Sequence, residues 1–273
     1  MSTITRHRTR SRAERVLIGA ALLGSALILV VPLLLIFATA LREGIGAYFS
    51  NILEPNTLHA IGLTVLAAIV VVPINVVFGI CAAWLVTRFK FPGRQLLITV
   101  IEIPFSVSPI VAGVTYLFLY GGQGLLGPAL QGAGIQLMFT VSAIFLVSLF
   151  VTAPFVAREL IPLMQQQGSE DEEASLSLGA NGWQMFWYVT LPNIRWALIY
   201  GAVLCNARVM GEFGAVSVVS GSIRGQTNTL PLQISLLFND FNVTGAFAAA
   251  STLALIAVVT LVVKSALEAR GWR

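Results

Sequence analysis

The chain has 273 residues, of which 57% are hydrophobic and only 10% are charged. An average soluble domain is nearer a quarter charged, so this composition excludes a soluble globular protein and indicates an integral membrane protein. The formal net charge of +4 comes from a basic cluster at residues 6–15 and from single basic residues at the ends of apolar segments, which argues against a nucleic-acid partner.

Six apolar segments follow one another along the chain, and each is long enough to cross a bilayer, which needs about 20 helical residues. The first is too long for the apolar core of a signal peptide, so we expect it to be a retained span. We therefore predict an all-α polytopic membrane protein in which a basic cytoplasmic segment, 1–15, precedes a single transmembrane domain, 16–273. The predicted spans are 16–41, 58–86, 96–120, 138–156, 194–219 and 243–266.

The basic residues predict the orientation of these spans. If both termini are cytoplasmic, thirteen of the 16 Lys and Arg residues fall on the cytoplasmic side, only Arg42 and Arg224 fall outside, and Arg208 lies within a span. Positive charge accumulates in this way on the cytoplasmic side of membrane proteins. The sequence therefore predicts cytoplasmic termini and a cytoplasmic interval 158–192. The connections on the other face are then 42–56, the glycine-rich loop 121–134, and 220–242.

The interval 158–192 is the only long polar stretch between strongly apolar segments. Four consecutive acids, residues 170–173, follow Ser169, which suits a helix N-cap, and acids in a first turn oppose the positive end of the helix dipole. A short helix over 169–178 outside the bilayer is therefore predicted, followed by an aromatic segment, 183–188; a plain solvated loop is the alternative. The residues expected to stop helices are Pro162 and Gly168 before it and Gly179 and Gly182 after it.

Prolines interrupt two of the predicted spans. Pro73 is expected to kink the second span, and Pro104 and Pro109 should break the hydrogen bonding of the third. Backbone groups freed at membrane depth are tolerated where they are buried or line a cavity. Ser106 and Ser108 add hydroxyl donors suited to a tetrahedral oxyanion, although a plain kink whose serines bond back to their own helix is the alternative.

The fifth span holds an arginine and a glutamate. Arg208 and Glu212 stand four residues apart on one helix face, where they can pair. Ionisable residues inside a span usually face the bundle interior or a water-filled cavity. An ion pair that pins this span to its neighbours is one interpretation, and a positive potential from Arg208 in an anion path is the other. The candidate translocation path therefore consists of Pro104, Ser106, Ser108, Pro109, Arg208 and Glu212.

The sequence lacks motifs for catalysis and for ATP binding. Neither lysine follows the glycine-rich phosphate-binding pattern that ends in Gly-Lys-Ser or Gly-Lys-Thr. The two cysteines, Cys81 and Cys205, lie in apolar segments, so neither a metal site nor a disulfide framework is indicated. We expect no catalytic residue, cofactor or metal in this chain, and ATP, if transport uses it, would bind another subunit.

One motif in the polar interval resembles a known family. Glu173-Ala174-Ser175, followed by Gly179, Phe186 and Leu191-Pro192, resembles the EAA loop of ABC-importer permeases, with Ser175 where a second alanine is usual. The resemblance implies that the loop 158–192 contains a coupling helix that docks on a cytoplasmic ATPase. The residues assigned to that contact are Glu172, Glu173, Ala174, Ser175, Gly179, Ala180, Phe186 and Pro192.

Most of the chain after residue 16 resembles a narrower branch of that family. The stretches 84–89, 91–95 and 211–223 are similar to the W-type (CysW) permeases for sulfate and thiosulfate, in an oxyanion branch that includes molybdate permeases. The resemblance implies the type I ABC importer permease fold, with six transmembrane helices and a coupling helix, in a bacterial inner membrane. Molybdate or tungstate is the alternative cargo, and a secondary transporter that works without an ATPase is a further alternative.

The resemblance also implies partners. These are a homologous T-type permease subunit in a heterodimer, two copies of an ATPase subunit that hold ATP and Mg, and a periplasmic sulfate- or thiosulfate-binding protein. The connection 220–242 would meet the binding protein, and its apolar run, 232–238, suits a short interfacial helix. The candidate docking residues are Gly221, Gln226, Asn228 and Pro231.

Overall fold

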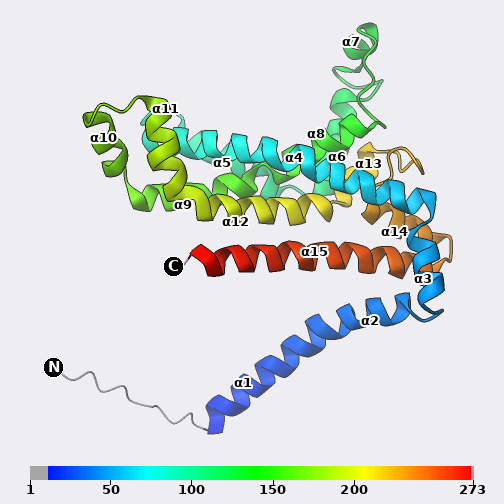
Figure 1. Cartoon of the computed structure of the whole chain (residues 1–273). Helices are drawn as coiled ribbons and strands as arrows, with labels where there is room; N and C mark the ends of the chain where they lie inside the picture. Colours follow the sequence, from blue (N-terminus) through cyan, green and yellow to red (C-terminus); the bar gives the residue numbers. More distant parts are fainter. Residues whose placement is uncertain (1–11, 272–273) are drawn as a thin grey trace.

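The computed structural model describes residues 12–271, which contain helices, turns and loops but no strand. Residues 1–11, most of the predicted basic cytoplasmic segment, lie outside the described residues. Long helices run side by side, and α10 lies at the same end of the molecule as the C-terminal end of α15, with α3 and α14 at the other end (Figure 1). The predicted all-α class is confirmed.

The N-terminal apolar run forms α1 (Arg12–Ser25), a π-helical turn η1 (Ala26–Val30) and α2 (Val31–Ala40). The apolar stretch of these helices, Val16–Ala40, is long enough to cross a membrane, and α1 leads away from the helix bundle (Figure 1). The connection that follows is more ordered than predicted, since it contains α3 (Ile45–Ile52), whose Tyr48 hydroxyl lies 3.1 Å from that of Ser251 on α15.

Three helices pack closely at the centre: α4 (Pro55–Arg88), α9 (Pro154–Gln167) and α12 (Leu191–Met210). Two glycines permit this approach, because a Cβ at Gly79 would lie 2.5 Å from Val156 Cγ1 and one at Gly201 would lie 3.1 Å from Val156 Cα. Asn75 donates to the Thr152 hydroxyl at 2.7 Å inside the same core. In the α4–α9–α12 core the helix backbones therefore approach one another closely, as small residues allow between membrane helices.

The predicted fourth span is longer than expected. Its helices, α8 (Val141–Thr152) and α9, together cover Val141–Gln167, and Pro162 lies inside α9 rather than ending it. The prediction for Pro162 was wrong. Proline has no backbone N–H to donate within the helix, but packing against both α4 and α12 holds α9 together at this position. Gly168, with φ +69°, ends the helix as predicted.

The predicted third and fifth spans are both broken. α5 (Arg94–Ser106) and α6 (Pro109–Tyr120) meet at 107°, with Pro104 inside α5 and only Pro109 at the break. The fifth segment breaks at 211–213, between α12 and α13 (Gly214–Val219). The two breaks lie together, because a Cβ at Gly214 would lie 3.1 Å from Pro109 Cβ.

The predicted count of six membrane helices is not confirmed. Within residues 12–271, four helical stretches are long and apolar enough to cross a membrane, or up to five if the bent α5–α6 pair counts as one. The remaining elements are α7 (Gly127–Gly132) in the glycine-rich loop, α10 (Glu170–Ser177), α11 (Gly182–Met185), the π-helical η2 (Phe186–Thr190), α14 (Leu230–Asn239) and α15 (Val243–Gly271).

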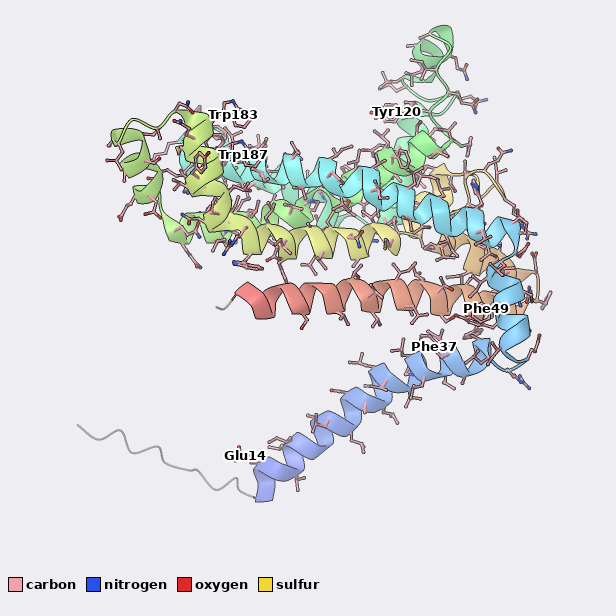
Figure 2. All side chains as sticks on the ribbon, viewed as in Figure 1. Glu14, Phe37, Phe49, Tyr120, Trp183 and Trp187 are labelled. Carbon is pink, nitrogen blue, oxygen red and sulfur yellow. The ribbon has the colours of Figure 1, made fainter. Side chains whose placement is uncertain are left out.

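Aromatic side chains mark both ends of the bundle. Trp183 and Trp187 lie at the end that carries α10, whereas Phe49 and Tyr120 lie towards the other (Figure 2). Trp and Tyr are enriched at the two membrane–water interfaces, so this placement agrees with helices that cross the bilayer along the bundle.

Candidate functional site

The predicted helix in the polar interval is present as α10, Glu170–Ser177. It ends in a Schellman motif, in which the Ala180 amide donates to the Ser175 carbonyl at 3.1 Å and Gly179 adopts φ +92°. Ser169 occupies the N-cap position, but its hydroxyl donates to the Glu173 carboxylate and accepts no hydrogen bond from the backbone amides of the helix.

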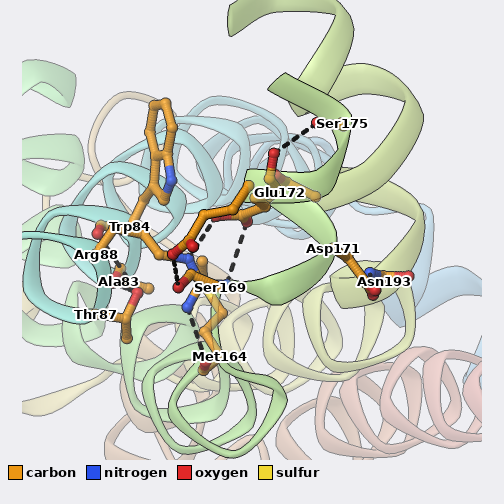
Figure 3. A network of polar contacts seen from close by, with 12 residues as sticks. Ala83, Trp84, Thr87, Arg88, Met164, Ser169, Asp171, Glu172, Ser175 and Asn193 are labelled. Atoms are coloured by element: carbon orange, nitrogen blue, oxygen red, sulfur yellow. Dashed lines mark hydrogen bonds and ion pairs between the residues drawn. The ribbon is translucent and has the colours of Figure 1, made fainter. Parts of the chain in front are cut away.

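Glu172 points inward from α10, into a polar network with α4 (Figure 3). Arg88 donates to its carboxylate from Nε at 2.6 Å and from Nη2 at 3.2 Å, and the Thr190 hydroxyl donates to it at 2.8 Å. Arg88 Nη1 also donates to the Met164 carbonyl at 3.0 Å. Glu172 is 7% exposed and points into the protein, whereas its neighbours Glu173 and Ala174 are exposed, so the part of Glu172 in an ATPase contact stays a prediction.

The other residues of the motif gather at the same end of the molecule. Glu173, Ala174 and Gly179 are exposed, whereas Ser175 is half-buried and donates to the Glu172 carbonyl at 2.7 Å. Ala180 and Phe186 are half-buried, and Pro192 is exposed near the start of α12. The Phe186 ring lies against Trp84 at 6.3 Å and Trp183 at 6.2 Å between ring centres. The outward face of α10 is therefore open, and it carries acids together with the exposed apolar side chain of Leu176.

Arg208 and Glu212 form the predicted ion pair at the end of α12. The Glu212 side chain is 1% exposed and that of Arg208 is 30% exposed, so only the arginine is partly exposed at the surface of this chain. Glu212 also accepts a hydrogen bond from the Ala215 amide at 2.8 Å, at the start of α13. The spacing of Arg208 and Glu212 does not reveal this second contact, although an acid two residues before Gly214 can accept from the first amides of a new helix.

The two serines of the third segment differ in what they contact. The Ser106 hydroxyl donates to the Ile103 carbonyl at 3.0 Å, so it bonds back to its own helix as the alternative interpretation held. Ser108 is exposed at the N-cap position of α6, where its side chain caps no amide. The structure thus brings Pro109 close to the break of the fifth segment, whereas Pro104 lies within α5.

The connection 220–242 is anchored more firmly than its sequence indicated. Gly221 and Gln226 are exposed and Pro231 is half-buried. Asn228, in contrast, is 0% exposed, and its side-chain amide donates to the Gln233 side chain, so its assignment as a docking residue stays a prediction that its burial does not favour. His59 Nε2 lies 3.1 Å from the Gln226 carbonyl and fastens this segment to α4.

Comparison with known proteins places the chain in a family. Residues 75–272 match the family described as "Binding-protein-dependent transport system inner membrane component". The chain is 58% identical to the sulfate transport system permease protein CysW of Escherichia coli K12, over 94% of this chain and 87% of that protein. It is 34% identical to the sulfate transport system permease protein CysT of the same organism, over 94% and 92%.

A solved structure confirms the fold. A chain from a bacterial alginate ABC transporter, crystallised in complex with an alginate pentasaccharide-bound periplasmic protein, superposes with a TM-score of 0.75 over 94% of this chain and 93% of that one, at 16% identity. This chain belongs to the inner-membrane components of binding-protein-dependent transport systems, the ABC-importer permeases, and within them to the family of CysW.

Proposed function

We propose that this chain is one of two membrane subunits of an ATP-driven importer that carries sulfate or thiosulfate into the cytoplasm of a bacterium. The 58% identity to a sulfate permease over 94% of the chain is the observation that carries the proposal. Molybdate is not favoured, because the permeases to which the chain is similar are named for sulfate. The chain is a permease subunit and not an enzyme, since ATP hydrolysis in such importers occurs in a separate subunit.

The proposed complex contains one copy of this chain, one T-type permease and two ATPase subunits, which hold ATP and Mg. A periplasmic protein would deliver the anion at the end that carries α3 and α14, and the ATPase would dock on the exposed residues of α10 at the other end. Both termini would then be cytoplasmic, in agreement with the positive-inside distribution of Lys and Arg.

The anion path would pass the paired breaks of the third and fifth segments. Interrupted membrane helices in transporters present backbone groups to a substrate near the middle of the bilayer. Arg208, whose side chain is 30% exposed, would present a positive group beside these breaks, and the buried Glu212 carboxylate forms an ion pair with it. This placement supports a path for a dianion.

Copurification tests the composition of the complex. Tagged chain extracted from membranes should bring down a T-type permease and an ATPase, and the purified complex should hydrolyse ATP faster when a sulfate-loaded binding protein is added. A preparation that contains this chain without an ATPase, and that transports sulfate after ATP depletion, would instead support a secondary transporter.

A further inference from the structure

The coupling helix α10 has a single buried residue, Glu172. All of its other side chains are exposed or half-buried, so no apolar core holds the helix against the protein. The chain on either side passes through glycines with positive φ, Gly168 at +69° and Gly179 at +92°, conformations in which bulkier residues are strained. Asn193 of α12 also donates a hydrogen bond to Asp171 at 3.2 Å, but that contact is exposed. The buried attachment of α10 to the transmembrane bundle therefore depends on what Glu172 contacts.

Glu172 is attached through Arg88 to the α4–α9–α12 core. Arg88 is the last residue of α4, Met164 belongs to α9, and Thr190 ends η2 just before α12 begins. The planar guanidinium of Arg88 donates three hydrogen bonds, two to the Glu172 carboxylate oxygens and one to the Met164 carbonyl. The Thr190 hydroxyl donates a fourth hydrogen bond to the same carboxylate. Because the two guanidinium donors lie in one plane, they fix the orientation of the carboxylate as well as its distance.

The burial of this pair sets it apart from surface ion pairs. The Arg88 and Glu172 side chains are 11% and 10% exposed, whereas those of Arg224 and Asp240, another pair in the described residues, are 48% and 47% exposed. Exposed pairs contribute little because solvent screens them, but a buried pair persists only where geometry and further hydrogen bonds offset desolvation. The Arg88–Glu172 pair meets both conditions.

We propose that Arg88 and Glu172 are positioning residues that make α10 move as one body with α4 and α12, so that displacement of α10 by the ATPase reaches the transport path. α12 ends at Met210, directly before the break that holds Glu212, which gives the motion a route from α10 to that break. The proposal rests on the proposed function, because it requires an ATPase that docks on α10.

The test compares variants in the complete complex, reconstituted in proteoliposomes with the binding protein. Arg88→Met combined with Glu172→Met removes the oriented pair without leaving a buried unpaired charge, a replacement that stability often tolerates. We expect normal yield of the complex and sustained ATP hydrolysis, with a severalfold fall in sulfate taken up per ATP hydrolysed. Arg88→Lys keeps the charge but loses the fork, and should fall in between. Lys90→Met, which removes an exposed charge next to α4, is the matched control and should keep the wild-type ratio.

A distance measurement checks the same claim without transport. Spin labels on the native Cys81, exposed on α4, and on Ser177→Cys, exposed on α10, should give a narrow distance distribution in the wild type and a broad one in the double methionine variant. A wild-type sulfate-to-ATP ratio in that variant, or an unchanged distribution, would overturn the proposal. A wild-type complex without ATP-dependent sulfate uptake would instead overturn the proposed function.

Discussion

Glu212 bridges the break in the fifth membrane segment by contacts on both sides of it. Its carboxylate pairs with Arg208 on α12 and accepts a hydrogen bond from the Ala215 amide on α13 at 2.8 Å. The carboxylate is buried while the arginine side chain is partly exposed at the surface of this chain, so the two members of the pair have different surroundings. The glutamate joins the two helices, and the arginine is the member that an anion could approach.

Arg208→Ala leaves the Glu212 charge buried and unpaired, and breaking a buried pair in this way costs about 3–5 kcal/mol. We therefore predict a low yield of the complex. Arg208→Met combined with Glu212→Gln should restore the yield, because glutamine still accepts from the Ala215 amide and no charge remains unpaired. Sulfate uptake should stay low in the double variant if Arg208 attracts the anion.

Uptake and yield in the single, double and Arg208→Lys variants separate the two roles of the arginine. Full recovery of uptake in the double variant would make Arg208 an ion-pair partner alone. Wild-type uptake in Arg208→Ala would contradict both roles.

Gly179→Trp should uncouple ATP hydrolysis from transport. The residue has φ +92°, which strains any side chain, and it is exposed at the end of α10 where the ATPase is proposed to dock. We expect a complex that reaches the membrane and hydrolyses ATP but takes up little sulfate. Gly93→Trp is the matched control, since Gly93 has φ +89° and open space around it but is not among the residues assigned to the ATPase contact. Equal uptake in the two variants would argue against a contact at Gly179.

The binding protein should crosslink to one face of the connection 220–242. In a chain carrying Cys81→Ser, a cysteine at the exposed Gln226 should react with a thiol-directed crosslinker and the bound periplasmic protein, and one at the fully buried Asn228 should not. The yield of crosslinked product on a gel checks this. No product at Gln226, with product at a position on α10, would contradict the proposed orientation.

Gly79→Ala should weaken the α4–α9–α12 core. The added Cβ would lie 2.5 Å from Val156 Cγ1, and overpacking of this kind typically costs about 1–3 kcal/mol. Gly62→Ala lies on the same helix with nothing within 4 Å and should behave as wild type. The apparent melting temperature of the purified complex should fall only in the first variant. An unchanged melting temperature would show that the helices can separate at little cost.

The sequence predicted short local features better than it predicted where a helix continues and where it breaks. The α10 helix followed from acids placed after a serine and ended by a glycine, and its bounds differ from the prediction by one residue at each end. Local signals of this kind act over a single turn. The Arg208–Glu212 pair followed from spacing alone.

Features set by tertiary packing were missed. Pro162 remains inside α9 because neighbouring helices hold it, and Glu172 faces Arg88, a residue that sequence analysis used only as a mark of membrane orientation. A pair separated by 84 residues carries no periodic signal. The count of six spans is not confirmed for a related reason, because hydropathy does not register a 107° bend inside a single apolar run.

The most direct test of the account is uptake of radiolabelled sulfate by proteoliposomes that contain the complete complex. We predict uptake that requires both ATP on the side of α10 and the loaded binding protein on the other side, and that unlabelled thiosulfate reduces more than molybdate does. Uptake that continues without ATP or without the binding protein would contradict the account.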